Sequence, residues 1–77
     1  MPYRLTKKGR SLAVTLKSAK VDFLTDMQSE ALLYALKVPK RNYFSASDVA
    51  EDCKYPNGQY FRGVLTSLYR RGYLSKQ

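Results

Sequence analysis

The stretch Tyr55-Pro56-Asn57-Gly58 limits the possible folds of this chain more than any other feature of its sequence. Three of its four residues are turn formers, so the backbone must bend or reverse there before it can become helical again. A short helix is expected before it, from about residues 45–47 to Cys53, because serine suits the N-cap and Asp48 favours the positive helix end. A longer helix is expected after it, over about Asn57–Arg71. The sequence therefore predicts two helices joined by a tight turn.

The longer of these helices is amphipathic. Its inward residues recur at helical spacing and are Phe61, Val64, Leu65 and Leu68. Its outward residues are Gln59, Gly63, Thr66 and Arg70, flanked by Tyr60, Arg62 and Ser67. Gly72 follows, where a left-handed residue commonly ends a helix. A helix-turn-helix requires a capped helix, a turn and a second helix with a polar, basic outer face.

The remaining segments complete one domain over residues 1–77. Tyr3–Leu5 alternates like a strand, and Thr6 suits the N-cap of a helix over about Lys7–Lys20. Thr25, with glutamine three residues later, predicts a capping box for a helix that ends at Val38 before a proline. Tyr73–Gln77 alternates and is expected to be a short edge strand. The apolar stripe of the first helix comprises Leu12, Ala13, Leu16 and Ala19, with Phe23 continuing it. The expected fold is mainly α, with about four helices and a small antiparallel sheet of two or three strands.

Charge is segregated along the chain. Met1–Val21 carries six basic residues and no acid, and residues 54–77 carry five basic residues and no acid. All six acids lie between Asp22 and Asp52, where three basic residues accompany them. The formal net charge of +8 attracts polyanions. Two basic ends that lie near each other in the fold would form one binding face.

The spacing over Ser45–Leu74 resembles that of winged-helix transcription regulators. In that family the recognition helix closes with a leucine, two or three charged residues, a glycine and a hydrophobic strand. The corresponding stretch here is LYRRGYL, Leu68–Leu74. The helix expected over Thr25–Val38 takes the place of the family's first helix. The resemblance implies a winged helix-turn-helix fold.

The N-terminal segment YRLTKKGRSL is similar to a second wing strand that leads into an exit helix in many winged-helix regulators. It also resembles the opening of Rrf2-type regulators, whose cluster-binding cysteines this chain lacks, so an iron–sulfur role is not expected. Only five residues follow Gly72, too few for a complete wing hairpin. We therefore expect Tyr3–Leu5 to pair with Tyr73–Ser75 and to bring the two basic ends together.

The resemblance and the side-chain chemistry together imply double-stranded DNA as the partner. The helix over Asn57–Arg71 would enter the major groove, with residues near its start reaching bases and those near its end reaching phosphates. Glutamine suits adenine edges and arginine suits guanine or phosphate, so Gln59, Tyr60 and Arg62 are candidates for base readout. The full set of candidate DNA-binding residues is Lys7, Lys8, Arg10, Asn57, Gln59, Tyr60, Arg62, Gly63, Thr66, Arg70, Arg71 and Lys76.

Other functional classes have little support in the sequence. There is no histidine, no phosphate-binding loop and no nucleophile-elbow motif, so neither an enzyme nor a cofactor is expected. The single cysteine, Cys53, is expected to pack inward, and alone it can form neither a metal site nor an internal disulfide. No apolar run is long enough for a membrane span or a signal peptide. A reducing intracellular compartment, such as the cytoplasm, is the expected location.

Three alternatives stay open at this point. The same fold could serve as a module for protein–protein contacts. It could also bind single strands by stacking bases on Tyr60, Tyr69 and Tyr73, although amphipathic core-edge packing is the ordinary role of tyrosine. The polar side of the helix over Asn57–Arg71 could simply face water. A homodimer is possible, with the helix over Lys7–Lys20 as the contact.

Overall fold

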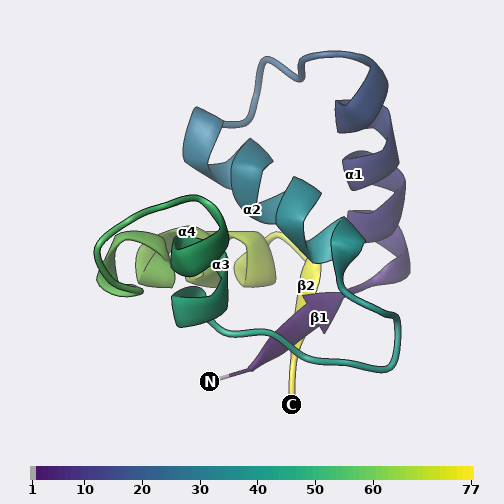
Figure 1. Cartoon of the computed structure of the whole chain (residues 1–77). Coiled ribbons are helices and arrows are strands. Elements are labelled where there is room, and N and C mark those ends of the chain that lie inside the picture. The colour runs from purple at the N-terminus through teal and green to yellow at the C-terminus, as the bar shows by residue number, and fades with distance from the viewer. Residues whose placement is uncertain (1) are drawn as a thin grey trace.

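The computed structural model describes residues 2–77 and contains, in that range, four helices and one two-stranded antiparallel sheet. The mainly α architecture with a small sheet is therefore as predicted. Figure 1 shows α3 and α4 side by side, α1 against α2, and the sheet below the helices. In chain order the elements are β1 (Tyr3–Leu5), α1 (Lys7–Ser18), α2 (Asp26–Lys37), α3 (Ala46–Asp52), α4 (Gln59–Arg70) and β2 (Leu74–Lys76).

Helix α1 begins where the sequence predicts and ends earlier. The Thr6 side chain accepts a hydrogen bond from the Gly9 backbone N–H, so Thr6 is the N-cap. The last helical residue is Ser18, two positions before the predicted end at Lys20. The prediction that Phe23 continues the apolar stripe is wrong, because helical periodicity no longer applies after Ser18. Phe23 is 60% exposed, and its neighbour Leu24 is buried instead.

Helix α2 begins with the predicted capping box. The Gln28 N–H donates to Thr25 Oγ1 at 3.1 Å, and the Thr25 N–H donates to Gln28 Oε1 at 3.0 Å. Gln28 is the buried polar residue among the described residues, and its Nε2 donates to Ser67 Oγ on α4 at 3.2 Å. One side chain therefore caps α2 and also joins α2 to α4.

Replacing Gln28 by alanine is expected to lower the free energy of unfolding by about 1–2 kcal/mol, because it removes half of the capping box and leaves Ser67 without this partner. Gln28→Glu is the matched control, since glutamate keeps the capping oxygen and can accept from the Ser67 hydroxyl. Urea unfolding measures both variants. Equal losses in the two would show that the hydrogen bonds are not what stabilises this position.

The helices on either side of the turn are shorter than predicted, but their caps follow the sequence. Ser45 and Asp48 form a capping box at the start of α3. Helix α4 begins at Gln59 rather than Asn57, because the Asn57 side chain accepts from the Gln59 N–H at 2.9 Å and so lies outside the helix. At the other end of α4, Gly72 has the expected left-handed backbone, with φ of 85°.

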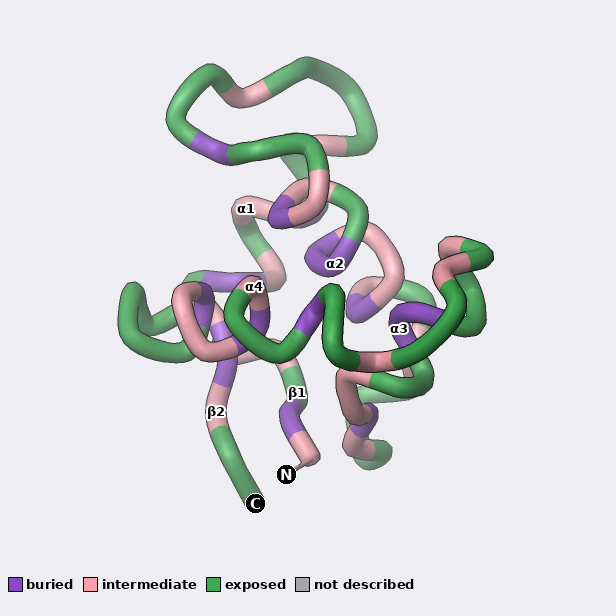
Figure 2. Tube along the Cα trace, turned by 90° about the vertical axis from the view of Figure 1, so that its left-hand side faces the viewer, coloured by how far each residue is buried: buried purple, intermediate pink, exposed green. Residues whose placement is uncertain are grey.

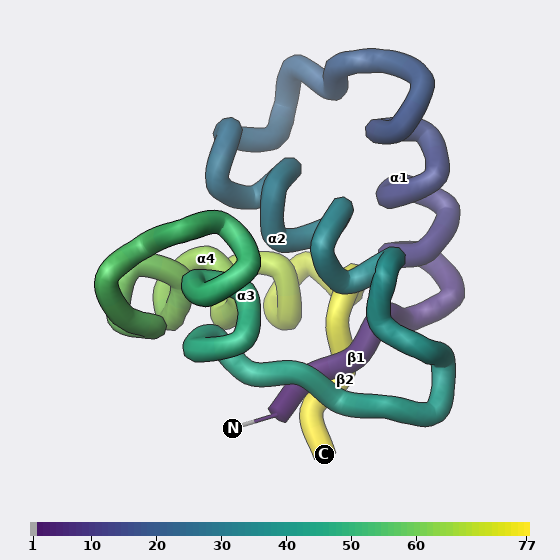
Figure 3. The backbone as a smooth tube through the Cα atoms, in the orientation of Figure 1, coloured from purple at the N-terminus to yellow at the C-terminus, as the bar shows by residue number. Residues whose placement is uncertain are grey.

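Strand β1 pairs with β2, as the sequence predicts. Arg4 lies opposite Ser75 in the antiparallel register, and β2 begins one residue later than expected, at Leu74. On its other side β1 forms a single bridge with Phe44, through Tyr3. Strand β1 therefore lies between Phe44 and β2, and the two ends of the chain meet, as the tube in Figure 3 also shows. The Gln77 N–H donates to the Pro2 carbonyl at 3.2 Å.

The core lies where the helices meet above the sheet. Figure 2 shows its buried segments concentrated at the centre, with mostly exposed residues in the connection after α1 and at the C-terminal end. Helix α4 contributes three fully buried residues, Phe61, Leu65 and Leu68, which were predicted to face inward. Between Pro2 and Gln77, no helix has both the length and the apolar character needed to cross a bilayer.

Candidate nucleic-acid interface

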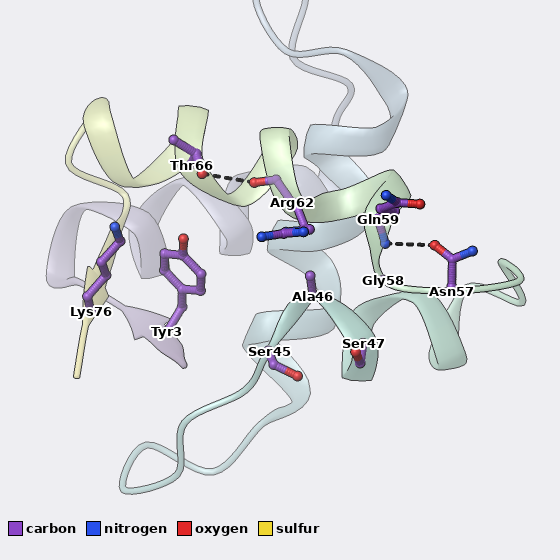
Figure 4. Close-up of a pocket in the computed structure, with 10 residues that line it drawn as sticks. All are labelled: Tyr3, Ser45, Ala46, Ser47, Asn57, Gly58, Gln59, Arg62, Thr66 and Lys76. Carbon is purple, nitrogen blue, oxygen red and sulfur yellow. Dashed lines mark hydrogen bonds between the residues drawn. The ribbon is translucent and has the colours of Figure 1, made fainter. Parts of the chain in front are cut away.

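The largest hollow in the described part of the chain lies beside the first half of α4. We call it the α4 hollow. It measures about 650 Å³ and opens between α4, the start of α3 and the ends of β1 and β2. Figure 4 shows its lining, which consists of Tyr3, Ser45, Ala46, Ser47, Asn57, Gly58, Gln59, Arg62, Thr66 and Lys76. The lining contains two cations and no acid.

The turn between α3 and α4 holds these two helices close together. A side chain at Gly58 would place its Cβ 2.8 Å from the Ser47 backbone nitrogen and 2.9 Å from the Ser47 hydroxyl oxygen. Lys54, just after α3, adopts a left-handed backbone with φ of 63°, which turns the chain toward Gly58. Because Phe61 then anchors α4 in the core, the residues on its far side face the hollow.

Gln59, Arg62 and Thr66 project from α4 into the hollow (Figure 4). They lie three and four residues apart, so they share one side of the helix. The Thr66 hydroxyl donates to the Arg62 carbonyl at 2.9 Å, which leaves its oxygen lone pairs available to accept. Arg62 is exposed, and the one ion pair among residues 2–77 joins Lys37 to Asp52. The guanidinium therefore presents its five donors without a carboxylate partner.

Lys76 stands at the opposite wall, held by aromatic rings. Its ammonium nitrogen lies 4.6 Å from the centre of the Tyr69 ring and 5.9 Å from that of Tyr3. The two rings meet edge to face at 6.3 Å, and Tyr3 is buried. Cation–π contact orients an ammonium without neutralising it. Lys76 therefore adds a fixed positive charge at the edge of the hollow.

The other predicted residues of α4 lie outside the hollow. Tyr60 points to the other flank of the helix, where its ring centre lies 5.4 Å from that of Tyr55. Gly63 faces open space, with no other atom within 4 Å of where its Cβ would be. Arg70 and Arg71, at the C-terminal end, are exposed. Ser67 was predicted to flank the outer face, which is wrong, because it turns inward to accept from Gln28.

The structure separates the three cations at the start of α1. The Lys8 ammonium donates to the Arg71 carbonyl at 3.2 Å and lies 5.1 Å from the centre of the Tyr73 ring, so it caps the end of α4. Arg10 lines a different hollow, together with Arg4. Lys7 is exposed. The basic ends do meet, but only Lys8 of these three has a recorded contact with the end of α4.

Five residues that line the α4 hollow were not predicted as site residues, namely Tyr3, Ser45, Ala46, Ser47 and Gly58. Ser45 was expected only as part of a helix start, and Ser47 and Tyr3 were given no role at the site. The serine positions at the start of α3 were the available signal, since side-chain hydroxyls and helix starts commonly contact phosphates. Their place opposite Arg62 depends on how α3 crosses α4, which no local pattern contains.

Acidic residues gather on a different side of α3. Asp48, Glu51 and Asp52 line a separate hollow with Tyr34. Burial raises the pKa of the Tyr34 hydroxyl, and these three carboxylates raise it further. Burial also raises the pKa of the Cys53 thiol, as do Glu30 and Asp52, while Lys37 lowers it. None of these three acids lines the α4 hollow, although the Asp48 carboxylate accepts hydrogen bonds from Ser45, which does.

No metal-binding constellation of three or more histidine, cysteine or acidic residues occurs within residues 2–77. Cys53 is half-buried and carries no disulfide. The concave face beside α4 therefore remains the strongest candidate site in this part of the chain. Comparisons of the chain with known protein families, with curated proteins and with solved structures found no match.

Proposed function

We propose that this chain is a winged helix-turn-helix domain that binds double-stranded DNA with sequence specificity, as a transcription regulator. One observation carries the proposal: Gln59 and Arg62 project from α4 into a concave, acid-free face that also contains Lys76. An arginine and a glutamine on the outer side of a helix can form bidentate hydrogen bonds with guanine and adenine edges in the major groove. Helix α4 is therefore the recognition helix of the proposal.

The arrangement of the small sheet supports the proposal that the fold is a winged helix. Helices α3 and α4 pack together across a tight turn, and β2 follows α4 after Gly72. Strand β1, from the segment that resembles a second wing strand, pairs with β2 and leads into α1. The wing of the proposal thus consists of two strands from the two ends of the described chain.

The positions of the side chains suggest a division of labour. Gln59 and Arg62 would read base edges, and Tyr60, beside Tyr55, would not. Phosphate contacts would come from Lys76 and Ser47 at the walls of the hollow and from the exposed cations Lys7, Arg70 and Arg71. Stacking of unpaired bases is the alternative, because Tyr60 and Tyr69 are 52% and 40% exposed. Lys76 lies over one of these rings, and Tyr55 packs beside the other.

Selection of binding sites from random duplex DNA tests the proposal. We expect the selected duplexes to share a short consensus and to compete better than random duplexes or single strands of the same length. A palindromic consensus would indicate a homodimer, for which α1 is the proposed contact because its Val14 side chain is 53% exposed. Absence of duplex binding at low salt, or binding that does not weaken with salt, would contradict the proposal.

A further inference from the structure

A second group of cations lies on the other face of β1. Arg4, Arg10 and Lys40 line a narrow hollow between β1, the start of α1 and the connection from α2 to α3. We call it the cationic hollow. Its floor includes Phe44, which is 2% exposed, and its rim includes Asn42. Arg4 and Arg10 belong to the basic N-terminal segment and Lys40 to the middle segment, and none of the three lines the α4 hollow.

The charges of the cationic hollow have no counterpart within the described chain. No carboxylate lines it, and the ion pair within residues 2–77 joins Lys37 to Asp52, away from this group. The Arg4 guanidinium lies 4.8 Å from the centre of the Tyr43 ring, which orients the side chain without cancelling its charge. Like charges gathered in one place repel each other. This hollow measures about 10 Å³, too small to enclose a phosphate. An anion at its rim would relieve this repulsion, and arginine geometry suits phosphate.

The two hollows face different directions. They share no lining residue, and Tyr3 lines one while its neighbour Arg4 lines the other. Successive side chains of a strand point to opposite faces of a sheet. Arg4 is therefore placed for a contact outside the α4 hollow.

We propose that the cationic hollow binds the phosphate backbone of a second DNA segment, so that one chain can hold two duplexes together. This inference rests on the proposed function, because the first of the two duplexes would be the one bound at α4. An acidic membrane surface is the other phosphate-rich partner, and it fits less well. The exposed large apolar side chains are Val14, Phe23, Tyr60 and Tyr69, and none of them lines this hollow to insert into lipid.

A bridging experiment tests this inference with the full chain. A biotinylated duplex on beads captures the protein, and a second, fluorescent duplex of the same sequence is then added at low salt. Fluorescence on the beads reports bridging, and anisotropy of the fluorescent duplex alone reports binding of one duplex. The test variant is Arg4→Ala/Lys40→Ala. The matched control is Lys20→Ala/Lys37→Ala, which removes the same charge from exposed positions outside α1 and outside both hollows.

We expect the wild-type chain and the control to bridge the duplexes. The test variant should capture ~10-fold less fluorescent duplex, while its affinity for a single duplex changes by less than about 3-fold, because its contacts at α4 remain. Bridging by the test variant at the wild-type level would overturn the inference and assign bridging to a dimer. Wild-type binding to one duplex without bridging would also overturn it, with the proposed function intact.

Two further outcomes separate this inference from the proposed function and from lipid binding. A wild-type chain that binds no duplex would contradict the proposed function and with it the inference. Sedimentation with vesicles that contain phosphatidylserine forms the second arm. Suppose that the control binds vesicles, that the test variant does not, and that no duplexes are bridged. This result would assign the cationic hollow to membrane binding.

Discussion

A Gly9→Ala variant is expected to lose about 3 kcal/mol or more of its free energy of unfolding, because the added methyl group overpacks a site closed by backbone. Its Cβ would lie 1.9 Å from the Tyr73 carbonyl oxygen and 2.8 Å from the carbonyl carbon. No side-chain rotation relieves a clash with main chain. The start of α1 and the end of α4 would have to separate. Urea unfolding followed by circular dichroism measures the loss.

Gly63→Ala is the matched control, since Gly63 also lies within a helix but faces open space. Alanine there is expected to stabilise the fold by roughly 0.5–1 kcal/mol through its higher helix propensity. The two identical substitutions should therefore move the unfolding midpoint in opposite directions. Similar midpoints for both variants would mean that the start of α1 does not approach the Tyr73 backbone as described.

The second large effect, on the affinity for DNA, is expected from the substitution Arg62→Ala. If Arg62 forms a bidentate contact with a base, its loss should weaken binding to the selected duplex by ~1–3 kcal/mol, about 5- to 150-fold, and change binding to random duplex much less. Arg62→Lys should keep most binding to random duplex and lose the preference for the selected one, because lysine lacks the planar fork. Fluorescence anisotropy over a salt series measures both affinities.

Lys20→Ala removes the same charge from an exposed position outside the α4 hollow and serves as the control for Arg62→Ala. Its effect on the selected duplex should be small. An equal loss on selected and random duplexes for Arg62→Ala would make Arg62 a phosphate contact instead of a base contact. If Arg62→Ala leaves the affinity for the selected duplex unchanged, the α4 hollow is not part of the DNA-binding surface.

Much of the fold follows from local signals in the sequence. Thr6, Thr25 and Ser45 are N-caps, and Gly72 takes the left-handed backbone expected after α4. These positions are decided by hydrogen bonds and backbone conformations within a few residues. The pairing of the two chain ends was also predictable, because β2 needed a partner. Phe23 was misassigned, since the end of α1 at Ser18 carries no strong stop signal such as glycine or proline.

The site was less predictable than the fold. Helical periodicity correctly places Gln59, Arg62 and Thr66 away from the core, but it cannot say which of the outward residues meet in one hollow. That choice depends on the crossing of α3 and α4 and on the position of β1, which are tertiary features. For the same reason the sequence did not separate Arg10 from Lys8, although both lie in the first turns of α1.

The closure between Thr6 and Gly72 has a consequence for how the chain folds. The Thr6 hydroxyl donates to the Gly72 carbonyl at 2.6 Å, and the Thr6 N–H donates to the Tyr73 carbonyl at 3.1 Å. These contacts close a loop of nearly the whole chain, so they carry a large loop-closure entropy and slow the search for the native topology. Any partial opening that releases β1 also removes Tyr3 from beneath Lys76. Local opening of β1 would therefore also remove one wall of the α4 hollow.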